Sequence, residues 1–276
     1  MRIGIDVAQH HLGWEEMVDR VRFAEDAGFD GAWVFDHFKP LYGDPGGPCM
    51  EGWTLLAALA ACTTRIRLGT LVTGVTYRNP ALLAAEAATV DHVSDGRLEL
   101  GVGAAWFEAE HDALGFDFPR AGERIDRLEE AIQVVKALFT ADGVSFDGRH
   151  YRLRDASYNP KPVQRPHPPI WVGGGGERRT LPLAARHADV WHGFGSPDVV
   201  ARKSAIVDRA AEEAGRDPST IARSTDLSIS EPLDEVRRTA DALREVGISY
   251  LVASWPADRA RMDQFAADVL PELAAD

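Results

Sequence analysis

Residues 66–102 read IRLGTLVTGVTYRNPALLAAEAATVDHVSDGRLELGV, and this stretch contains one complete strand–helix–strand unit. The run 66–72 is short and apolar, which is typical of a buried strand. Asn79 and Pro80 then mark the start of a helix, because proline suits the first turn. The run 96–102 reads as a second strand. Two strands joined through a helix are typical of a parallel sheet.

The same alternation continues in both directions along the 276 residues. Strands are expected at 2–7, 31–35, 66–72, 96–102, 169–173, 188–192, 222–229 and 249–253. Helices are expected at 14–27, at 53–62, from 79 onward and at 120–139. Eight strands alternating with helices predict an α/β fold, a (β/α)8 TIM barrel that forms a single domain over 1–276.

The regular pattern breaks over residues 140–168. Two short β-like runs, at 144–146 and 150–153, precede a proline-rich exit. The segment is too short to build a hydrophobic core of its own. We therefore predict an insertion between the fourth and fifth barrel strands.

The composition limits the classes of partner. A net charge of −13 argues against general binding to nucleic acid or to an anionic membrane. Cys49 and Cys62 form neither a disulfide framework nor a metal-ligand spacing. No apolar run is long enough for a signal peptide or a bilayer span. We therefore expect a cytoplasmic protein that acts on a small molecule.

Four consecutive glycines, Gly173–Gly176, follow the fifth predicted strand and precede Arg178 and Arg179. The active site of such a barrel lies on the loops after the C-terminal strand ends. Glycine lets the backbone approach a bulky anion, and a helix start offers unpaired N–H groups. We interpret the run as a phosphate-binding loop, although the commonest barrel phosphate site follows strands seven and eight. The alternative is a flexible turn with two solvated arginines.

His37 follows the second predicted strand, directly after Asp36. Histidine titrates near neutral pH, and His37 lies at a strand exit beside the Asp36 carboxylate, so His37 is the acid/base candidate. The alternative is a structural His–Asp hydrogen bond at the barrel rim. Because His10, His11 and His192 fall at the same mouth, a metal-dependent hydrolase has to be weighed. Their spacing is not that of a metal site, and we predict no metal.

Aromatic and acidic residues complete the expected mouth. Three tryptophans lie within predicted strands and are expected in the core: Trp33, Trp171 and Trp191. Trp106 lies beyond its strand end and is a candidate pocket wall. Glu108, Glu110 and His111 are expected on a solvated helix start, from which Glu108 could reach the mouth. The predicted substrate-pocket residues are His10, Trp106, Glu108 and His192.

Several ordered blocks resemble one family closely. Residues 24–38, AEDAGFDGAWVFDHF, resemble the opening unit of luciferase-like monooxygenases, as does TRIRLGT at 64–70 running into RNPA at 78–81. The most specific block is SDGRLELGVGAAW at 94–106, followed by GERIDRLEE at 122–130. PKPVQ at 160–164 and PIWVGG at 169–174 complete the resemblance.

The resemblance implies a barrel that uses reduced FMN or coenzyme F420, and the pattern is most similar to the F420-dependent branch. It implies a bulge at the end of the third strand, with a non-proline cis peptide at Leu71–Val72, against which the cofactor ring packs. It also implies that Asp36 and His37 are the catalytic pair, and that the protein is a homodimer. The expected cofactor-binding residues are Asp36, Thr70, Leu71, Val72, Thr73, Gly103, Ala104, Gly173, Gly174, Gly175, Gly176 and Arg178.

Two departures from the family pattern bear on function. Sugar-phosphate dehydrogenases of this branch have glutamate where Trp106 stands, which disfavours that substrate. Flavin-using luciferases carry a basic phosphate contact near Ala104 that is absent here, which favours F420. We therefore expect hydride transfer between F420 and an organic substrate that the sequence does not identify. The alternatives are an FMN-dependent monooxygenase and a barrel that binds a phosphorylated ligand without redox chemistry.

Overall fold

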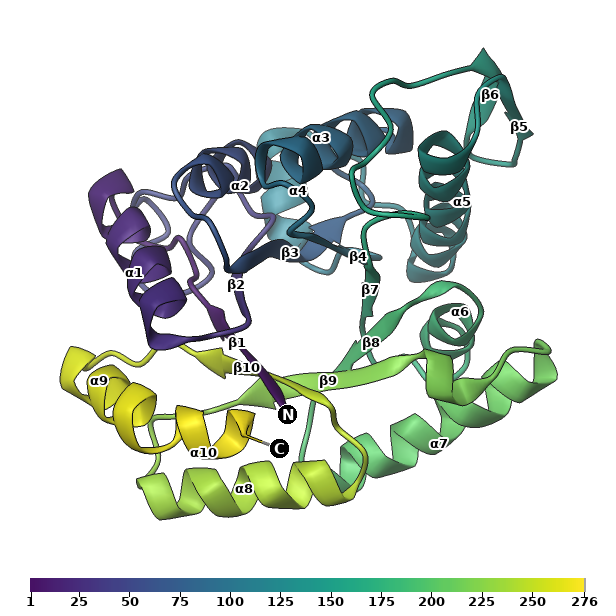
Figure 1. The fold of residues 1–276 in the computed structure, drawn as a ribbon. Coiled ribbons are helices and arrows are strands. Elements are labelled where there is room, and N and C mark those ends of the chain that lie inside the picture. The colour runs from purple at the N-terminus through teal and green to yellow at the C-terminus, as the bar shows by residue number, and fades with distance from the viewer. Residues whose placement is uncertain (276) are drawn as a thin grey trace.

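The computed structural model describes residues 1–275 and shows a closed barrel of parallel strands surrounded by helices (Figure 1). The barrel strands are β1 (Arg2–Asp6), β2 (Gly31–Val34), β3 (Arg67–Gly74), β4 (Leu98–Gly103), β7 (Ile170–Gly173), β8 (Val190–Gly193), β9 (Ala222–Leu227) and β10 (Tyr250–Ser254). Their order around the barrel is β1-β10-β9-β8-β7-β4-β3-β2. The predicted (β/α)8 barrel is confirmed, with strand ends displaced by up to two residues.

Helices cover the outside of the barrel. They are α1 (Trp14–Ala27), α2 (Gly52–Ala61), α3 (Pro80–Val93), α4 (Glu108–Leu114), α5 (Ala121–Thr140), α6 (Thr180–His187), α7 (Pro197–Glu213), α8 (Leu233–Glu245), α9 (Arg259–Asp268) and α10 (Leu270–Ala274), with a 3-10 turn at Pro218–Thr220. α3 begins at Pro80 as predicted, because the Asn79 side chain accepts a 2.8 Å hydrogen bond from the Ala81 amide. None of the helices in residues 1–275 is long and apolar enough to cross a membrane.

The insertion forms a two-stranded antiparallel hairpin between α5 and β7. β5 (Val144–Asp147) pairs with β6 (Arg152–Ala156), which begins two residues later than the predicted run. The Glu130 carboxylate of α5 accepts hydrogen bonds of 2.8 and 2.9 Å from the Arg149 and His150 amides. These bonds explain the late start, because they hold residue 150 in the connecting turn. The hairpin projects beside α5 (Figure 1).

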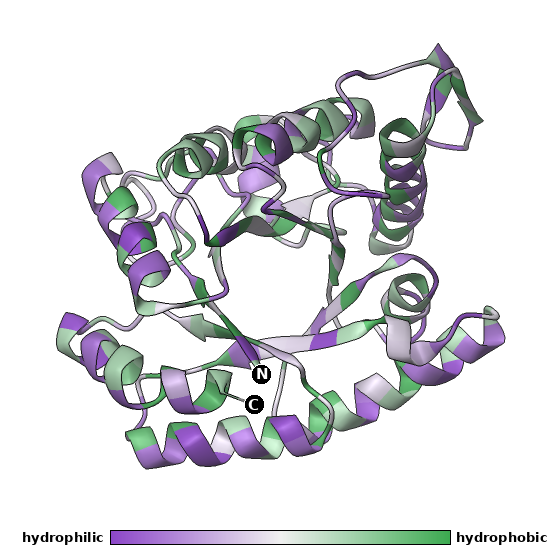
Figure 2. Ribbon diagram, in the orientation of Figure 1, coloured by the Kyte–Doolittle hydropathy of each residue, from purple (hydrophilic) through white to green (hydrophobic). Residues whose placement is uncertain are grey.

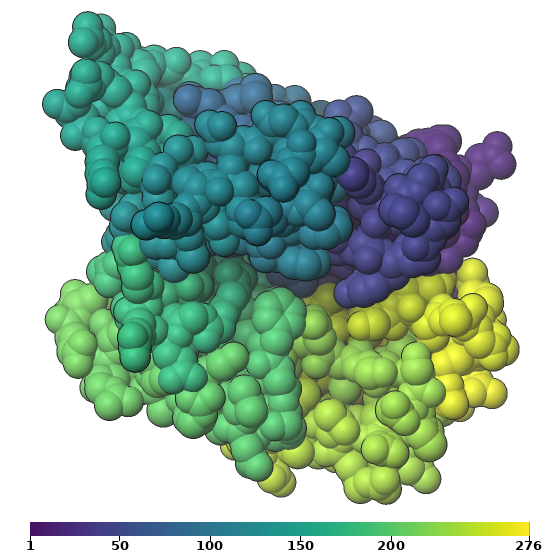
Figure 3. Space-filling view, turned by 180° about the vertical axis from the view of Figure 1, so that it is seen from behind, coloured from purple at the N-terminus to yellow at the C-terminus, as the bar shows by residue number. Residues whose placement is uncertain are grey.

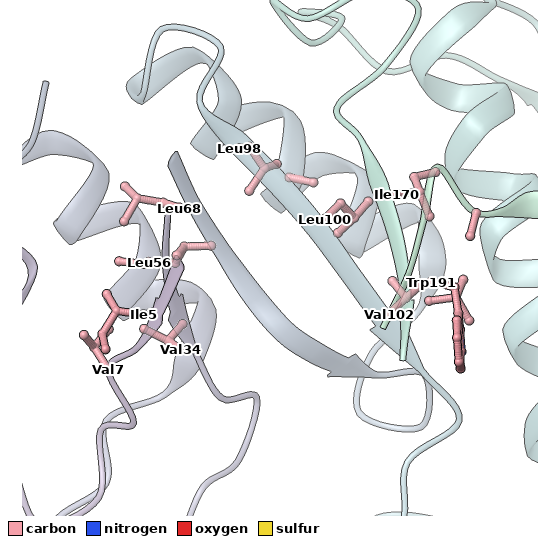
Figure 4. Close-up of a cluster of buried hydrophobic side chains, with 14 of the residues drawn as sticks. Ile5, Val7, Val34, Leu56, Leu68, Leu98, Leu100, Val102, Ile170 and Trp191 are labelled. Carbon is pink, nitrogen blue, oxygen red and sulfur yellow. The ribbon is translucent and has the colours of Figure 1, made fainter. Parts of the chain in front are cut away.

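Hydrophobic side chains fill the layer between the strands and the helices. Figure 4 shows part of this core, in which Leu68, Leu98, Leu100 and Ile170 come from neighbouring strands. The outer helices carry both hydrophobic and hydrophilic residues, as α7 and α8 show in Figure 2. This two-sided pattern buries one face of each helix on the barrel.

A separate aromatic layer fills the inside of the barrel. The Trp171 ring centroid lies 4.4 Å from that of Trp33 and 4.8 Å from that of Tyr250. Below the layer, Trp171 Nε1 donates a 2.6 Å hydrogen bond to Glu99, which also pairs with Arg67. All three predicted core tryptophans are buried, which confirms that prediction. Because side chains fill the barrel interior, a ligand has to bind outside it, and in such barrels the active site lies at the C-terminal mouth.

Candidate functional site

β3 is irregular at its C-terminal end, as the resemblance implied. The Leu71–Val72 peptide bond is cis, and the register with β4 shifts between Thr70 and Thr73. The Thr70 and Thr73 hydroxyls lie 2.7 Å apart, and both residues are buried. Trp53 Nε1 donates to the Thr73 hydroxyl at 3.1 Å. The threonines therefore hold the bulge together, while the half-buried Leu71 and Val72 form an apolar shelf.

The apolar shelf and the glycine run lie next to each other. A Cβ built on Gly173 would lie 2.9 Å from Val72 Cγ1, and one built on Gly103 would lie 2.6 Å from Val72 Cγ2. The Val72 side chain thus occupies the space that both glycines leave free. A single ligand of moderate length can therefore contact both the shelf and the glycine run.

The glycine turn, Gly173–Gly176, offers unused backbone donors. The Gly174 amide donates to the His192 carbonyl at 3.1 Å, and the Gly174 carbonyl accepts from Trp191 Nε1 at 2.8 Å. Within residues 1–275 the Gly175 and Gly176 amides make no hydrogen bond. Unpaired N–H groups in an exposed turn are a typical anion-binding arrangement.

The cation beside the glycine turn is not the predicted Arg178. Arg178 is exposed and contacts no charged or polar group in the described part of the chain. Arg179 turns away to pair with Asp126 of α5. Lys203 of α7 instead lies over the turn, since a Cβ built on Gly175 would be 2.5 Å from its Nζ. Its ammonium group is therefore placed to contact an anion held by the turn.

His37 is held by Glu110 of α4. His37 Nδ1 lies 2.9 Å from Glu110 Oε2, to which the Tyr77 hydroxyl also donates at 2.5 Å. The Phe38 and Lys39 amides donate to Oε1 at 2.9 and 3.1 Å. Burial would raise the pKa of Glu110, but the hydrogen bonds from His37, Tyr77 and Phe38 lower it to about 2. Glu110 is thus an anion that fixes Nδ1 and leaves Nε2 for a substrate.

His37 and Asp36 do not pair with each other, so the alternative of a structural His–Asp hydrogen bond at the rim is wrong. Asp36 is buried and forms a bidentate ion pair with Arg78, with N–O distances of 2.6 and 3.0 Å. The Gly74 amide donates to the same carboxylate at 3.1 Å. Burial raises the pKa of Asp36, and Arg78 and the Gly74 amide oppose that rise. Successive residues at a strand end point to opposite sides, so Asp36 fastens the β2 loop to β3 while His37 faces α4.

The expectation of a solvated helix start at α4 is also wrong. Glu110 and His111 are buried, and only the helix's first residue, Glu108, is exposed among the three. The His111 ring stacks on Tyr77 with centroids 4.6 Å apart and meets Phe118 at 4.6 Å. These aromatic contacts hold α4 against the mouth. Because Tyr77 and Phe118 lie in other segments, the sequence of α4 alone does not reveal that the helix is buried.

The predicted substrate-pocket residues fall in three different places. Trp106 is 64% exposed, and its ring centroid lies 5.8 Å from that of His37. Burial and the nearby His37 lower the pKa of His10, which lies on the same side of the mouth. Glu108 lies at the outer edge. His192 is buried on β8 and, two residues after the interior Val190, faces the inside of the barrel.

A basic residue does approach Ala104 in space. Arg124 of α5 donates from Nε to the Ala104 carbonyl at 3.0 Å and from Nη1 to the Pro119 carbonyl at 2.5 Å. Its guanidinium also lies 3.8 Å from the Phe118 ring centroid. Arg124 thus brings a guanidinium close to Ala104 that the neighbouring sequence does not supply.

The histidines of the rim do not assemble into a ligand set. Nowhere in residues 1–275 are three or more His, Cys, Asp or Glu side chains placed to hold a metal ion.

A hollow of about 680 Å³ lies at the N-terminal rim of the barrel, opposite the mouth, beside Asp208, Arg223 and Gly247. It includes none of the predicted site residues. On the side seen in Figure 3, the surface is hollowed between the N-terminal and C-terminal segments.

Sequence reasoning missed the roles of Glu110, Arg78 and Lys203. Glu110 contacts a residue 73 positions away, and Arg78 contacts one 42 positions away. Only the folded barrel brings these partners together. The one local signal for Glu110 was a carboxylate in a short helix next to a strand exit.

Comparison with known proteins identifies close relatives. The chain matches the family described as luciferase-like monooxygenase over residues 1–269. It is 35% identical over 245 residues to an F420-dependent glucose-6-phosphate dehydrogenase of Nocardia farcinica, covering 85% of this chain and 70% of that protein. It is 32% identical over 243 residues to an FMNH2-dependent dimethylsulfone monooxygenase of Pseudomonas putida, covering 84% and 66%.

Solved structures share the fold. An F420-dependent secondary alcohol dehydrogenase in complex with an F420–acetone adduct aligns with a TM-score of 0.87 at 21% identity, over 99% of this chain and 98% of the other. The coenzyme F420-dependent tetrahydromethanopterin reductase from Methanopyrus kandleri aligns with a TM-score of 0.85 at 18% identity, over 99% of both chains. At these identities the likeness concerns the fold.

Proposed function

The chain belongs to the luciferase-like monooxygenase family, and on that basis we propose that it transfers a hydride between coenzyme F420 and a small organic substrate. One observation carries the proposal: the Leu71–Val72 shelf touches the glycine turn at the mouth that also holds His37. The F420-dependent relative from Nocardia farcinica supports the choice of coenzyme.

The residues at the mouth fit a ligand with a flat ring and a phosphate. Leu71 and Val72 would take the ring, because they are the accessible residues of the bulge and Leu71 rests on the aromatic layer. The unpaired Gly175 and Gly176 amides and the Lys203 ammonium would take the phosphate. When bound, F420 supplies a ring carbon that exchanges a hydride and reacts poorly with oxygen.

His37 would exchange the proton that accompanies the hydride. Oxidation of an alcohol removes a hydride from carbon and a proton from oxygen, and reduction of a carbonyl reverses both transfers. Because Glu110 holds Nδ1 at 2.9 Å, Nε2 is the nitrogen that can meet the substrate oxygen. The Glu110 anion stabilises the imidazolium that forms when His37 accepts the proton. His37 therefore acts as base in oxidation and as acid in reduction.

An FMN-dependent monooxygenase is the second candidate. The relative from Pseudomonas putida, at 32% identity, favours it. FMN also carries a flat ring and a phosphate, so the shelf and the glycine turn would suit it as well. The two candidates differ in whether molecular oxygen is a co-substrate.

Titration with each cofactor distinguishes the candidates. We expect F420 to bind with a Kd on the order of 1 µM and reduced FMN to bind at least ten times more weakly. His37→Asn should leave the F420 Kd within about twofold while abolishing turnover of any alcohol that the wild type oxidises. His92→Asn, at an exposed histidine of α3, is the matched control. Binding of reduced FMN without binding of F420 would favour the monooxygenase instead.

A further inference from the structure

Three polar side chains point into the barrel at the C-terminal ends of β1, β8 and β9. They are Asp6, His192 and Asp226. Alternate residues of a strand face the same side. Val190 and Ala222 belong to the interior layer, so His192 and Asp226, two and four residues later, face inward as well. Gly4, two residues before Asp6, faces the interior residue Tyr250.

Two buried polar atoms of this group make no hydrogen bond in the described part of the chain. His192 Nδ1 lies 3.0 Å from the Ser224 hydroxyl, but Nε2 makes no hydrogen bond within residues 1–275. The nearest carboxylate oxygen, of Asp226, is 3.2 Å from Nε2 and outside hydrogen-bonding geometry. Asp6 Oδ1 is also buried without a partner. Since buried polar groups are usually satisfied, a further polar group is expected to complete the set.

The three residues offer both a donor and a negative charge. Burial and the neighbouring Asp226 raise the pKa of Asp6 to about 8, so Asp6 carries a proton at neutral pH. The Asp226 side chain is 48% exposed and supplies an accessible carboxylate. A hydroxyl group both donates and accepts a hydrogen bond, so it can use both groups at once. A phosphate only accepts, and a carboxylate repels it.

We propose that Asp6, His192 and Asp226 form an acidic wall that binds a hydroxyl of a neutral or cationic substrate and excludes anionic substrates such as sugar phosphates. The assignment rests on the proposed function, because it places the substrate between this wall and His37. β1, β10, β9 and β8 form one side of the barrel, and β2, β3, β4 and β7 form the other (Figure 1). The shelf and His37 belong to the second side.

An aromatic residue borders the acidic wall. The Phe194 ring meets His192 edge-on, with centroids 4.9 Å apart, and Phe194 is 49% exposed. It would give a small organic substrate an apolar surface next to the hydroxyl-binding groups. The chain would thus act on a different substrate class from its relatives named glucose-6-phosphate dehydrogenases.

Three related sugars that differ in charge test the acidic wall. They are neutral glucose, cationic glucosamine and anionic glucose 6-phosphate. Their Kd values for the F420-loaded protein are measured by ligand-observed NMR on the wild type, Asp226→Asn and Asp6→Asn. Asp19→Asn, at an exposed residue of α1, is the matched control. We expect the wild type to bind glucose and glucosamine at least ten times more tightly than glucose 6-phosphate. The ratio should fall at least threefold in Asp226→Asn, which removes the accessible negative charge, and stay unchanged in Asp19→Asn. Asp6→Asn replaces a neutral group by another neutral group, so it should leave the ratio within about twofold.

Tighter binding of glucose 6-phosphate than of glucose by the wild type would overturn the proposal. So would a ratio that Asp226→Asn leaves unchanged, or failure of all three sugars to bind. Fluorescence titration of F420 into each variant is done first, which separates the two proposals. If F420 does not bind but FMN does, the proposed function fails, and the same sugar series on the FMN-loaded protein still tests the wall.

Discussion

At the scale of single residues, two carboxyl groups at the mouth differ in charge at neutral pH: Glu110 is an anion and Asp6 is neutral. Glu110 accepts four hydrogen bonds and is ionised, whereas Asp6 has one unpartnered oxygen and is protonated. The difference follows from the donors that surround each group and not from depth of burial alone. The two residues therefore predict opposite responses of stability to pH.

Replacement of Glu110 by glutamine should remove stability that is present only above acidic pH. The pKa of Glu110 is lowered from 4.5 to about 2 on folding, so its contribution is full above pH 4.5 and is lost as the pH falls toward 2. We expect the Tm of Glu110→Gln to lie about 3 °C or more below that of the wild type at pH 7, with a smaller gap at pH 4. Thermal denaturation measures this. Glu108→Gln, on the same helix, is the control, and a gap independent of pH would contradict the assignment.

Replacement of Asp6 by asparagine should have the reverse pH dependence. The pKa of Asp6 is raised from 3.8 to about 8, so the folded protein binds a proton that the unfolded chain releases. Wild-type stability then declines as the pH rises from 3.8 to 8. We expect Asp6→Asn to raise the Tm by about 3 °C or more at pH 8.5 and by less at pH 4.5. A variant that is less stable than both the wild type and Asp19→Asn at pH 8.5 would show that the Asp6 carboxylate is paired in the fold.

At the scale of elements, the contact between the glycine turn and α7 predicts which part of the coenzyme Lys203 recognises. F420 carries a phosphate that its precursor, the deazaflavin FO, lacks. We expect Lys203→Met to weaken F420 binding about tenfold, a loss of about 1.4 kcal/mol, and to leave FO binding within about twofold. Fluorescence titration measures both affinities. Arg209→Met, at an exposed residue of the same helix, is the control. Equal losses for F420 and FO would mean that Lys203 acts on the fold and not on the phosphate.

The contact between β3 and β4 predicts a rescue experiment. A Cβ at position 103 would lie 2.6 Å from Val72 Cγ2, so Gly103→Ala should push the shelf out of place. We expect a Tm lower by about 3 °C or more and F420 binding weakened about tenfold. Val72→Ala in the same chain removes the clashing methyl group and should restore most of the lost Tm. Gly13→Ala, where an added Cβ meets nothing within 4 Å, is the control. If Val72→Ala does not restore the Tm, the loss of stability in Gly103→Ala arises outside the shelf.

The elements themselves could be predicted well because each one carries its own signals. α1 (Trp14–Ala27) and the start of α3 at Pro80 fall where Gly28 and Asn79–Pro80 predicted them. β6 was misplaced because its start depends on Glu130, which binds the connecting turn from another element. α4 was misjudged because its burial depends on aromatic residues of two other segments.

At the scale of the whole molecule, the barrel followed from the count of strand–helix units, and the mouth followed from the barrel. The sequence could therefore place His37 and the glycine turn at one end, and the resemblance to the family placed the bulge there. It could not pair Asp36 with Arg78 or His37 with Glu110, because strand alternation and distant helices decide those contacts. The expected homodimer stays a prediction, which light scattering would test as a mass of one chain or two.

The aromatic layer of Trp33, Trp171 and Tyr250 has a consequence for kinetics. It closes the barrel interior, so a ligand that binds at the C-terminal mouth must also dissociate from that mouth. Two ligands bound at the same mouth can block each other's dissociation. Under the proposed function, coenzyme and substrate would therefore enter and leave at the same end of the barrel.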